Sequence, residues 1–237
     1  MTIRFFLGLA LLLAASAKAE KPNVILMMAD DLGYGDLSCY GSEKLRTPVL
    51  DQLARDGVRL TSYYAGATVC TPSRMALLTG AYPPRLGWTG GVIGYRIQRD
   101  NGLAPEARTM ADVFKTAGYA TTLIGKWHLG DSAELHPLRQ GFDSAYFIDK
   151  SNNQTKKLWR DEELVADPFD NRRLTQQFIT EAIRFVEANR EKHFFSKLLT
   201  YGSLEGLDFW CVHMRRKPFC SPAYAIQACD VIRLNFT

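Results

Sequence analysis

The strongest chemical pattern in this 237-residue sequence is Cys70-Thr-Pro-Ser-Arg74, at the start of a helix predicted from about Ser73 to Thr79. Helix N-termini attract anions, because their first amide hydrogens have no partner within the helix and the helix dipole is positive there. Residues four apart face the same side of a helix, so Cys70 lies beside the guanidinium of Arg74. That guanidinium can bind a tetrahedral oxyanion in bidentate fashion. The pattern predicts a nucleophile in an anion site, whereas an isolated cysteine is more often a buried structural residue.

Two adjacent carboxylates, Asp30 and Asp31, directly follow the apolar run Asn23–Ala29. A short continuous apolar run predicts a strand that is buried on both faces of a parallel sheet. Ligands of open α/β sheets bind at the carboxyl ends of strands, and oxygen ligands suit a hard cation such as Ca²⁺ or Mg²⁺. The pair therefore predicts a divalent-metal site, although adjacent aspartates also occur as helix caps and in solvated turns.

A lysine and a histidine, Lys126 and His128, follow a strand predicted at Tyr119–Gly125. In extended geometry, residues two apart point to the same side, so both side chains can reach one site. Lysine binds the oxygens of an anion as a point charge, and histidine exchanges protons near neutral pH. The position of this pair after a strand favours a functional role over the surface location that such pairs usually have.

The elements that must position these residues alternate along the chain. Further helices are predicted at 48–56, 110–117 and 174–189, a second strand at 58–64, and a loop at 86–103. Strands that alternate with helices of about ten residues imply βαβ units, a parallel sheet and an α/β fold.

These motifs resemble the N-terminal part of the sulfatase family, in its formylglycine-dependent, arylsulfatase-like form, from about Lys21 to Phe195. Cys-x-Pro-Ser-Arg followed by Leu-Thr-Gly80 resembles the family signature, which is recognised by the enzymes that oxidise cysteine to Cα-formylglycine (3-oxoalanine). Further motifs in the family's order are Pro22-Asn-Val-Ile-Leu26, Ala29-Asp-Asp-Leu-Gly-Tyr-Gly-Asp36, Thr47-Pro48, Gly125-Lys-Trp-His-Leu-Gly130 and Gln140-Gly-Phe-Asp143.

The resemblance implies a role for each candidate residue. Oxidised and hydrated, Cys70 becomes a geminal diol, of which one hydroxyl attacks sulfur and displaces the alcohol, and the other expels the covalent sulfate. Asp30, Asp31 and a diol oxygen of residue 70 bind the divalent ion, which is usually calcium; the ligand type also suits magnesium. Lys126 contacts the diol and the sulfate, and His128 is the base for the second hydroxyl.

The resemblance also implies the fold and the function. The fold is an alkaline-phosphatase-like sandwich, with a mixed, largely parallel sheet between helices, here apparently truncated. The function is hydrolysis of a sulfate monoester, aryl or carbohydrate, after maturation by a formylglycine-generating enzyme. One alternative is a phosphonate or phosphate monoester hydrolase of the same superfamily, and another is an inactive truncated fragment that binds sulfated glycans without turnover.

The C-terminal part departs from the family. Full sulfatases continue well beyond this length, and their second half supplies an Asp-Asn pair for the metal site together with a further lysine and histidine. No Asp-Asn pair follows Asp170-Asn171 here. The strand that the family has after the last helix is replaced by His193–Leu199, and the tail no longer resembles the family. We therefore divide the chain into a signal peptide (1–19), the N-terminal part of a catalytic domain (20–195) and a divergent tail (196–237).

The first nineteen residues have the pattern of a signal peptide, with Arg4, the apolar run Phe5–Ala15 and the cleavage motif Ala17-Lys-Ala19. The alternative is a membrane anchor, but the apolar run falls short of the ~20 residues that a bilayer span needs. We expect a secreted or periplasmic protein that has no membrane association after cleavage. A net charge of +4 without a basic run argues against nucleic acid as a partner.

Overall fold

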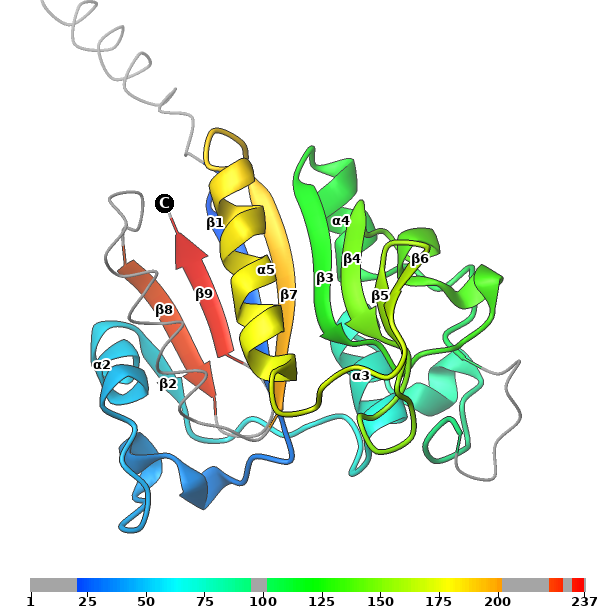
Figure 1. Cartoon of the computed structure of the whole chain (residues 1–237). Coiled ribbons are helices and arrows are strands. Elements are labelled where there is room, and N and C mark those ends of the chain that lie inside the picture. The colour runs from blue at the N-terminus through cyan, green and yellow to red at the C-terminus, as the bar shows by residue number, and fades with distance from the viewer. Residues whose placement is uncertain (1–20, 95–101, 202–221, 228–231, 237) are drawn as a thin grey trace, which may run out of the picture.

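The computed structural model describes residues 21–94, 102–201, 222–227 and 232–236, so the predicted signal peptide lies outside the described residues. Within them, nine strands form one sheet in the order β2-β8-β9-β1-β7-β3-β4-β5-β6 (Figure 1). The strands are β1 (Asn23–Asp30), β2 (Val58–Leu60), β3 (Ala120–Lys126), β4 (Ser144–Ile148), β5 (Leu158–Arg160), β6 (Glu163–Ala166), β7 (Phe194–Tyr201), β8 (Pro222–Gln227) and β9 (Ile232–Phe236).

The centre of the sheet is parallel and its flanks are mostly antiparallel. Strand β7 pairs in parallel with β1 on one side and with β3 on the other, and β3 pairs in parallel with β4. The pairs β1–β9, β4–β5, β5–β6 and β8–β9 are antiparallel. The carboxyl ends of β1 and β3, which carry the predicted site residues, therefore lie at the same edge of the sheet.

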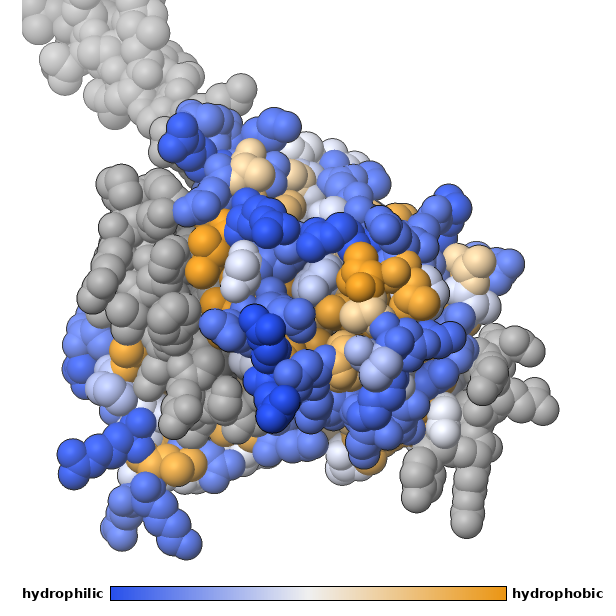
Figure 2. Space-filling model, viewed as in Figure 1, coloured by the Kyte–Doolittle hydropathy of each residue, from blue (hydrophilic) through white to orange (hydrophobic). Residues whose placement is uncertain are grey.

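Helices cover both faces of this sheet (Figure 1). They are α2 (Pro48–Asp56), α3 (Cys70–Thr79), α4 (Met110–Thr116) and α5 (Leu174–Ala188). Alternate residues of β1 enter two separate cores: Ile25 packs in the core formed with α2 and α5, and Leu26 in the core formed with α3 and α4. The outer surface over α5 is mainly hydrophilic, as expected of an amphipathic helix that faces solvent (Figure 2). This layered arrangement confirms the predicted α/β sandwich.

Most predicted elements are present, with small changes at their ends. The helix predicted from Ser73 starts at Cys70, because Val69 is already extended and occupies the N-cap position. The strand predicted at 58–64 is only β2, because the chain then turns away from the sheet toward α3. Where that segment meets α3, a Cβ added at Gly66 would lie 2.3 Å from the Ala76 Cβ, so only glycine permits this approach.

The prediction that a family strand is lost at His193–Leu199 is wrong, because β7 runs through this segment in the middle of the sheet. Phe194 and Phe195 point into opposite cores, so both faces of the strand are buried. Such a strand has no polar–apolar alternation to reveal it, and the polar pair Ser196-Lys197 interrupts its apolar run.

Two strands of the predicted tail complete the sheet. The backbone of β9 pairs with β1, and the backbone of β8 pairs with β9 and with β2. As a result β1 has a neighbour on each side instead of a bare edge. Among the described residues, no helix has both the length and the apolar character that a membrane span requires.

Lys197 is the most unusual side chain of β7. It is fully buried, and its Nζ has no hydrogen-bond partner among the described residues. Its neighbours across the sheet are Leu26 of β1 and Leu123 of β3. Burial, together with the positive charge of Arg74, lowers the pKa of Lys197 well below its ordinary value.

We predict that Lys197→Met increases the free energy of unfolding by roughly 1–3 kcal/mol, the usual cost of burying an unpaired polar group. A group whose pKa is lowered by folding destabilises the folded state below its ordinary pKa, and this penalty disappears as pH rises through that ordinary value. The deficit of the wild type relative to the variant should therefore shrink as pH rises toward about 10. Urea unfolding at several pH values measures this, and the exposed Lys192→Met is the control. Equal stability of wild type and Lys197→Met would contradict the prediction.

Candidate active site

Arg74 is the residue through which α3 is joined to the sheet. It is fully buried, one turn after Cys70, which is the first residue of the helix. Its Nη2 donates to Asp30 Oδ1 at 2.7 Å, and its Nη1 donates to the Lys126 carbonyl at 2.8 Å. Its Nε has no hydrogen-bond partner in the part of the chain that the structure describes. The guanidinium thus spans the carboxyl ends of β1 and β3.

Lys126 completes a cluster around the same carboxylate. Its Nζ lies 2.8 Å from Asp30 Oδ2 and 3.1 Å from Cys70 Sγ, and the side chain is 1% exposed. Four predicted residues from three elements, Asp30, Cys70, Arg74 and Lys126, are therefore in contact; we call them the Asp30 cluster. A parallel sheet accounts for this, because it brings the ends of β1 and β3 to one edge beside the N-terminus of α3.

The electrostatics of the Asp30 cluster favour an anion near Cys70. Burial alone would raise the pKa of Asp30, but the positive charges of Arg74 and Lys126 outweigh it and lower the pKa to about 2. Asp30 is therefore ionised at physiological pH. One carboxylate facing two cations leaves the cluster with one excess positive charge, which an oxyanion would neutralise.

Asp31 does not join the cluster. It is exposed and has a φ of 60°, in the left-handed region that aspartate tolerates better than most residues. The described residues contain no group of three or more His, Cys, Asp or Glu side chains that could hold a metal ion. The structure thus brings one of the two predicted carboxylate ligands to Cys70, and the predicted metal site stays a prediction.

His128 lies next to the cluster as a neutral base. Its Nε2 is 2.9 Å from the Ile93 carbonyl, which can only accept, so Nε2 carries the proton. Nδ1 is then an acceptor, and it has no hydrogen-bond partner among the described residues. Burial, with the positive charge of Lys126, lowers the pKa of His128 to about 3. His128 is therefore neutral at physiological pH, and its Nδ1 is a hydrogen-bond acceptor that binds a proton weakly unless negative charge lies beside it.

Two residues that the sequence analysis did not single out hold the site in place. The Thr71 hydroxyl donates to the His128 carbonyl at 3.0 Å and accepts from the Ile93 amide at 3.1 Å, so it joins α3 to both segments. Gly125 has a φ of 110°, and a Cβ there would lie 2.7 Å from the Leu199 Cβ. That glycine lets β3 pass β7 closely just before Lys126. In the sequence, the position of Gly125 directly before the Lys126-x-His128 pattern was the signal that could have identified it.

Several known proteins resemble this chain in sequence. The sulfatase family model matches residues 22–206, which include all six predicted site residues. Mouse steryl-sulfatase is 53% identical over 147 residues, covering 58% of this chain and 24% of that protein. Human arylsulfatase A is 47% identical over 150 residues, which are 62% of this chain and 29% of that protein. The arylsulfatase of Hemicentrotus pulcherrimus is 36% identical over 202 residues, and the match covers 76% of this chain and 36% of that protein.

Two solved structures are similar to this one in fold. One, a structure of BT4656 in complex with its substrate D-glucosamine-2-N,6-O-disulfate, has a TM-score of 0.62 at 28% identity; the match covers 76% of this chain and 34% of that one. Ps i-CgsB has a TM-score of 0.78 at 22% identity, covering 92% and 66%, which supports the fold alone. The chain spans about a quarter to a third of the length of these curated relatives.

We predict that Asp30→Asn lowers the free energy of unfolding by about 3–5 kcal/mol, because it leaves two buried cations without their counter-charge. Asp31→Asn is the matched control and should change it by less than about 0.5 kcal/mol, because Asp31 is exposed. Chemical unfolding measures both variants.

The pH dependence gives a second measurement of the same interaction. A carboxylate with a lowered pKa stabilises the fold above its ordinary pKa, and this contribution disappears as pH falls through the folded value. The difference between wild type and Asp30→Asn should be complete at neutral pH and shrink between about pH 4 and pH 2. A difference that is already lost at about pH 5 would contradict the assigned pKa.

Proposed function

The chain belongs to the sulfatase family, and from that premise we propose that Cys70 is the precursor of a formylglycine nucleophile in a site that hydrolyses sulfate monoesters. The observation that carries the proposal is the contact of Cys70 with the buried Lys126, itself paired with Asp30. A thiol at this position, at the start of α3 and beside two cations, lies where a tetrahedral anion is best stabilised.

Sulfate binding is assigned to Arg74, Lys126 and the first amides of α3. Both cations are already fixed by hydrogen bonds to Asp30, and Arg74 also by its bond to the Lys126 carbonyl. Donors that are fixed before the substrate binds need little reorganisation as charge develops, which is the main source of electrostatic catalysis.

Two side chains, those of Lys126 and His128, are assigned to contact and deprotonate the nucleophile at residue 70. Oxidised and hydrated, residue 70 supplies two hydroxyls on one carbon, one for attack on sulfur and one for release of sulfate. Lys126 Nζ, 3.1 Å from Cys70 Sγ, is within reach of the group that replaces the sulfur. His128, which is neutral and whose Nδ1 has no partner among the described residues, is assigned to take the proton whose loss permits release. The negative charge of a bound sulfate would raise its low pKa and so strengthen it as a base.

A divalent ion fits this site by the chemistry of its donors. Asp30 ends β1 and Asp31 follows it, and their carboxylate oxygens suit Ca²⁺ or Mg²⁺; Asp30 is ionised at physiological pH. When bound, such an ion offsets negative charge that develops on the sulfate. Two carboxylates fall short of the about six to eight oxygens that calcium takes, so Asp30 and Asp31 would supply only part of its ligands.

We also propose a maturation partner and a location for the protein. The sequence around Cys70 resembles the recognition sequence of a formylglycine-generating enzyme, which would be its maturation partner. The N-terminal pattern, with a charged residue, an apolar run and a small-residue cleavage motif, supports export to a secreted or periplasmic location.

Two alternatives remain measurable. Phosphate or phosphonate monoesters are also tetrahedral oxyanions, so the cations of the Asp30 cluster bind them by the same contacts. A fragment that binds sulfate esters without turnover is favoured by the small number of metal ligands among the described residues. Sulfate and phosphate esters of one phenol, assayed side by side, separate the first alternative from the proposal.

We expect Cys70 to be converted to formylglycine when the chain is produced in a host that has the modifying enzyme. Peptide mass spectrometry detects the conversion. Cys39, half-buried and far from the motif, is the internal control and should stay an alkylatable thiol. Every molecule retaining a thiol at position 70 would contradict the proposal.

For protein in which that conversion is verified, we expect Lys126→Met to slow hydrolysis of an activated aryl sulfate by about 10²–10³-fold, as loss of one oxyanion contact does. Lys192→Met is the control and should leave the rate unchanged, and Cys70→Ala gives the blank. Binding of the aryl sulfate without turnover above that blank would favour the fragment alternative instead.

A further inference from the structure

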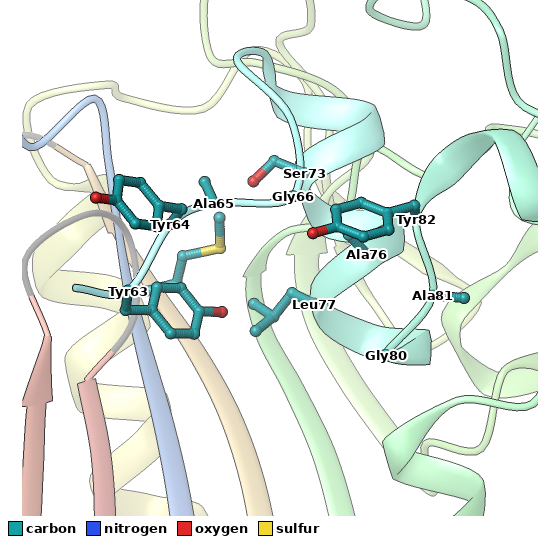
Figure 3. A pocket seen from close by; sticks show the side chains of 11 residues that line it. Tyr63, Tyr64, Ala65, Gly66, Ser73, Ala76, Leu77, Gly80, Ala81 and Tyr82 are labelled. Atoms are coloured by element: carbon teal, nitrogen blue, oxygen red, sulfur yellow. The ribbon is translucent and has the colours of Figure 1, made fainter. Parts of the chain in front are cut away.

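Pockets outside the Asp30 cluster differ in the side chains that line them. The one beside α3, where Tyr63 and Tyr64 face Tyr82, is lined by no charged side chain among the described residues (Figure 3). Another, the α5 pocket, has a volume of about 300 Å³, and four of the eight residues that line it are charged. Helices α3 and α5 pack on opposite faces of the sheet, and no member of the Asp30 cluster lines the α5 pocket. The α5 pocket is therefore separate from the candidate active site.

One side of α5 supplies most of the lining of the α5 pocket. Arg173, Gln177, Glu181 and Arg184 are spaced four, four and three residues apart, so they share one side of the helix. Arg160 of β5 lines the pocket from the sheet. The pocket thus lies between α5 and the neighbouring strands β4 and β5, which are side by side in Figure 1.

Glu181 orients two of the arginines. Its Oε1 accepts from Arg160 Nη1 at 2.6 Å, and its Oε2 accepts from Arg160 Nη2 at 2.9 Å and from Arg184 Nη1 at 3.1 Å. The Arg160 guanidinium also lies 4.6 Å from the centroid of the Tyr146 ring, which is a cation–π contact. A guanidinium has five N–H donors, and the contact with Glu181 uses one of those of Arg184. The carboxylate therefore fixes the guanidinium groups without using all their donors.

Three arginines and one glutamate line the α5 pocket, which gives its lining a net charge of +2. Arg173 also interacts with Asp170, but that carboxylate is already paired with Arg172. Asp161 interacts with Arg160 from a neighbouring pocket, and its carboxylate accepts a hydrogen bond from a backbone amide. An anion with two negative charges would therefore balance the residues that line the α5 pocket.

The α5 pocket also has a buried acceptor and room for more than a single ion. Gln177 Oε1 is buried and has no hydrogen-bond partner among the described residues, so a hydroxyl of a ligand would satisfy it. An engineered cavity of about 150 Å³ holds benzene, so this pocket has room for an oxyanion together with a six-membered ring. The matching ligand combines a dianion with hydroxyl groups.

We propose that the α5 pocket binds a phosphate monoester of a polyhydroxy alcohol, such as a sugar phosphate. A phosphate monoester carries close to two negative charges at neutral pH, whereas a sulfate monoester carries one, so the charge of the pocket favours phosphate. Arg173 and Arg184 bind the phosphate oxygens in forked geometry, and Gln177 Oε1 accepts from a hydroxyl of the alcohol. This site is independent of the proposed function, because it shares no lining residue with the Asp30 cluster.

The test adds glucose 6-phosphate to the isotope-labelled chain and follows the backbone amides by NMR. Amides of residues 176–184 report the α5 pocket, and those of residues 70–74 report the candidate active site separately. Arg173→Gln and Arg184→Gln should each weaken binding at α5 about tenfold, as loss of one hydrogen bond to a charged group does. Both side chains are exposed, so the variants should fold. Arg172→Gln is the matched control and should leave binding unchanged, because Arg172 does not line the pocket.

Further ligands test the charge and the alcohol separately. Glucose 6-sulfate and inorganic phosphate should each bind at α5 more weakly than glucose 6-phosphate. Gln177→Leu should weaken binding of the ester about 2–10-fold and leave inorganic phosphate unchanged. Binding of the ester should also weaken as pH falls from about 7 to about 5, because its phosphate gains a proton with a pKa of about 6. Burial raises the pKa of Tyr146, so this residue stays neutral over that range.

Three results would contradict the proposal. Glucose 6-phosphate that leaves the α5 amides unshifted, or that binds there equally in wild type and both arginine variants, would overturn the site itself. Equal affinity for glucose 6-sulfate would overturn the assignment of a dianion. Equal affinity for inorganic phosphate would overturn the assignment of an ester.

Discussion

The carboxylate of Asp30 is shared between the guanidinium of Arg74 and the ammonium of Lys126, and three elements of the fold meet in that contact. Removing two cations and one anion from water is costly, and the cost is offset only when the charges touch with good geometry. The relative positions of β1, β3 and the N-terminus of α3 therefore depend on this carboxylate. Cys70 is positioned by the same arrangement, since it starts α3 within reach of Lys126.

Two basic side chains near the Asp30 cluster, His128 and Lys197, are fully buried, and burial lowers the pKa of each. His128, with a pKa of about 3, is neutral at physiological pH and so avoids the cost of a buried charge. The Asp30 cluster itself keeps an excess of one positive charge. An oxyanion beside Cys70 would neutralise that excess, and any ligand that binds only the folded state stabilises it. The ionised groups are thus better satisfied with an anion bound than without one.

Sequence reasoning found the residues whose position follows from local rules. Arg74 lies one helical turn after Cys70, and Asp30 and Lys126 end strands of a parallel sheet, so their convergence could be predicted. Asp31 was expected beside them, but after the end of β1 its backbone takes a left-handed conformation and its side chain is exposed. The whole of β7 was missed, because the polar pair Ser196-Lys197 interrupts the apolar run by which β1, buried on both faces too, could be predicted. The contacts of Thr71 join segments far apart in sequence, and no local pattern encodes them.

Charge alone gives the Asp30 cluster little power to choose a substrate. Sulfate and phosphate monoesters share a tetrahedral oxyanion, and both match the forked geometry of a guanidinium. A divalent ion held by Asp30 and Asp31 would add two positive charges against the one negative charge of Asp31. The excess positive charge would then grow from one to two, which suits a monoanion or a dianion. Contacts with the alcohol, beyond the reach of Arg74 and Lys126, can select among esters of one anion. They cannot separate a sulfate from a phosphate ester of the same alcohol, so that choice depends on the total charge that surrounds the anion.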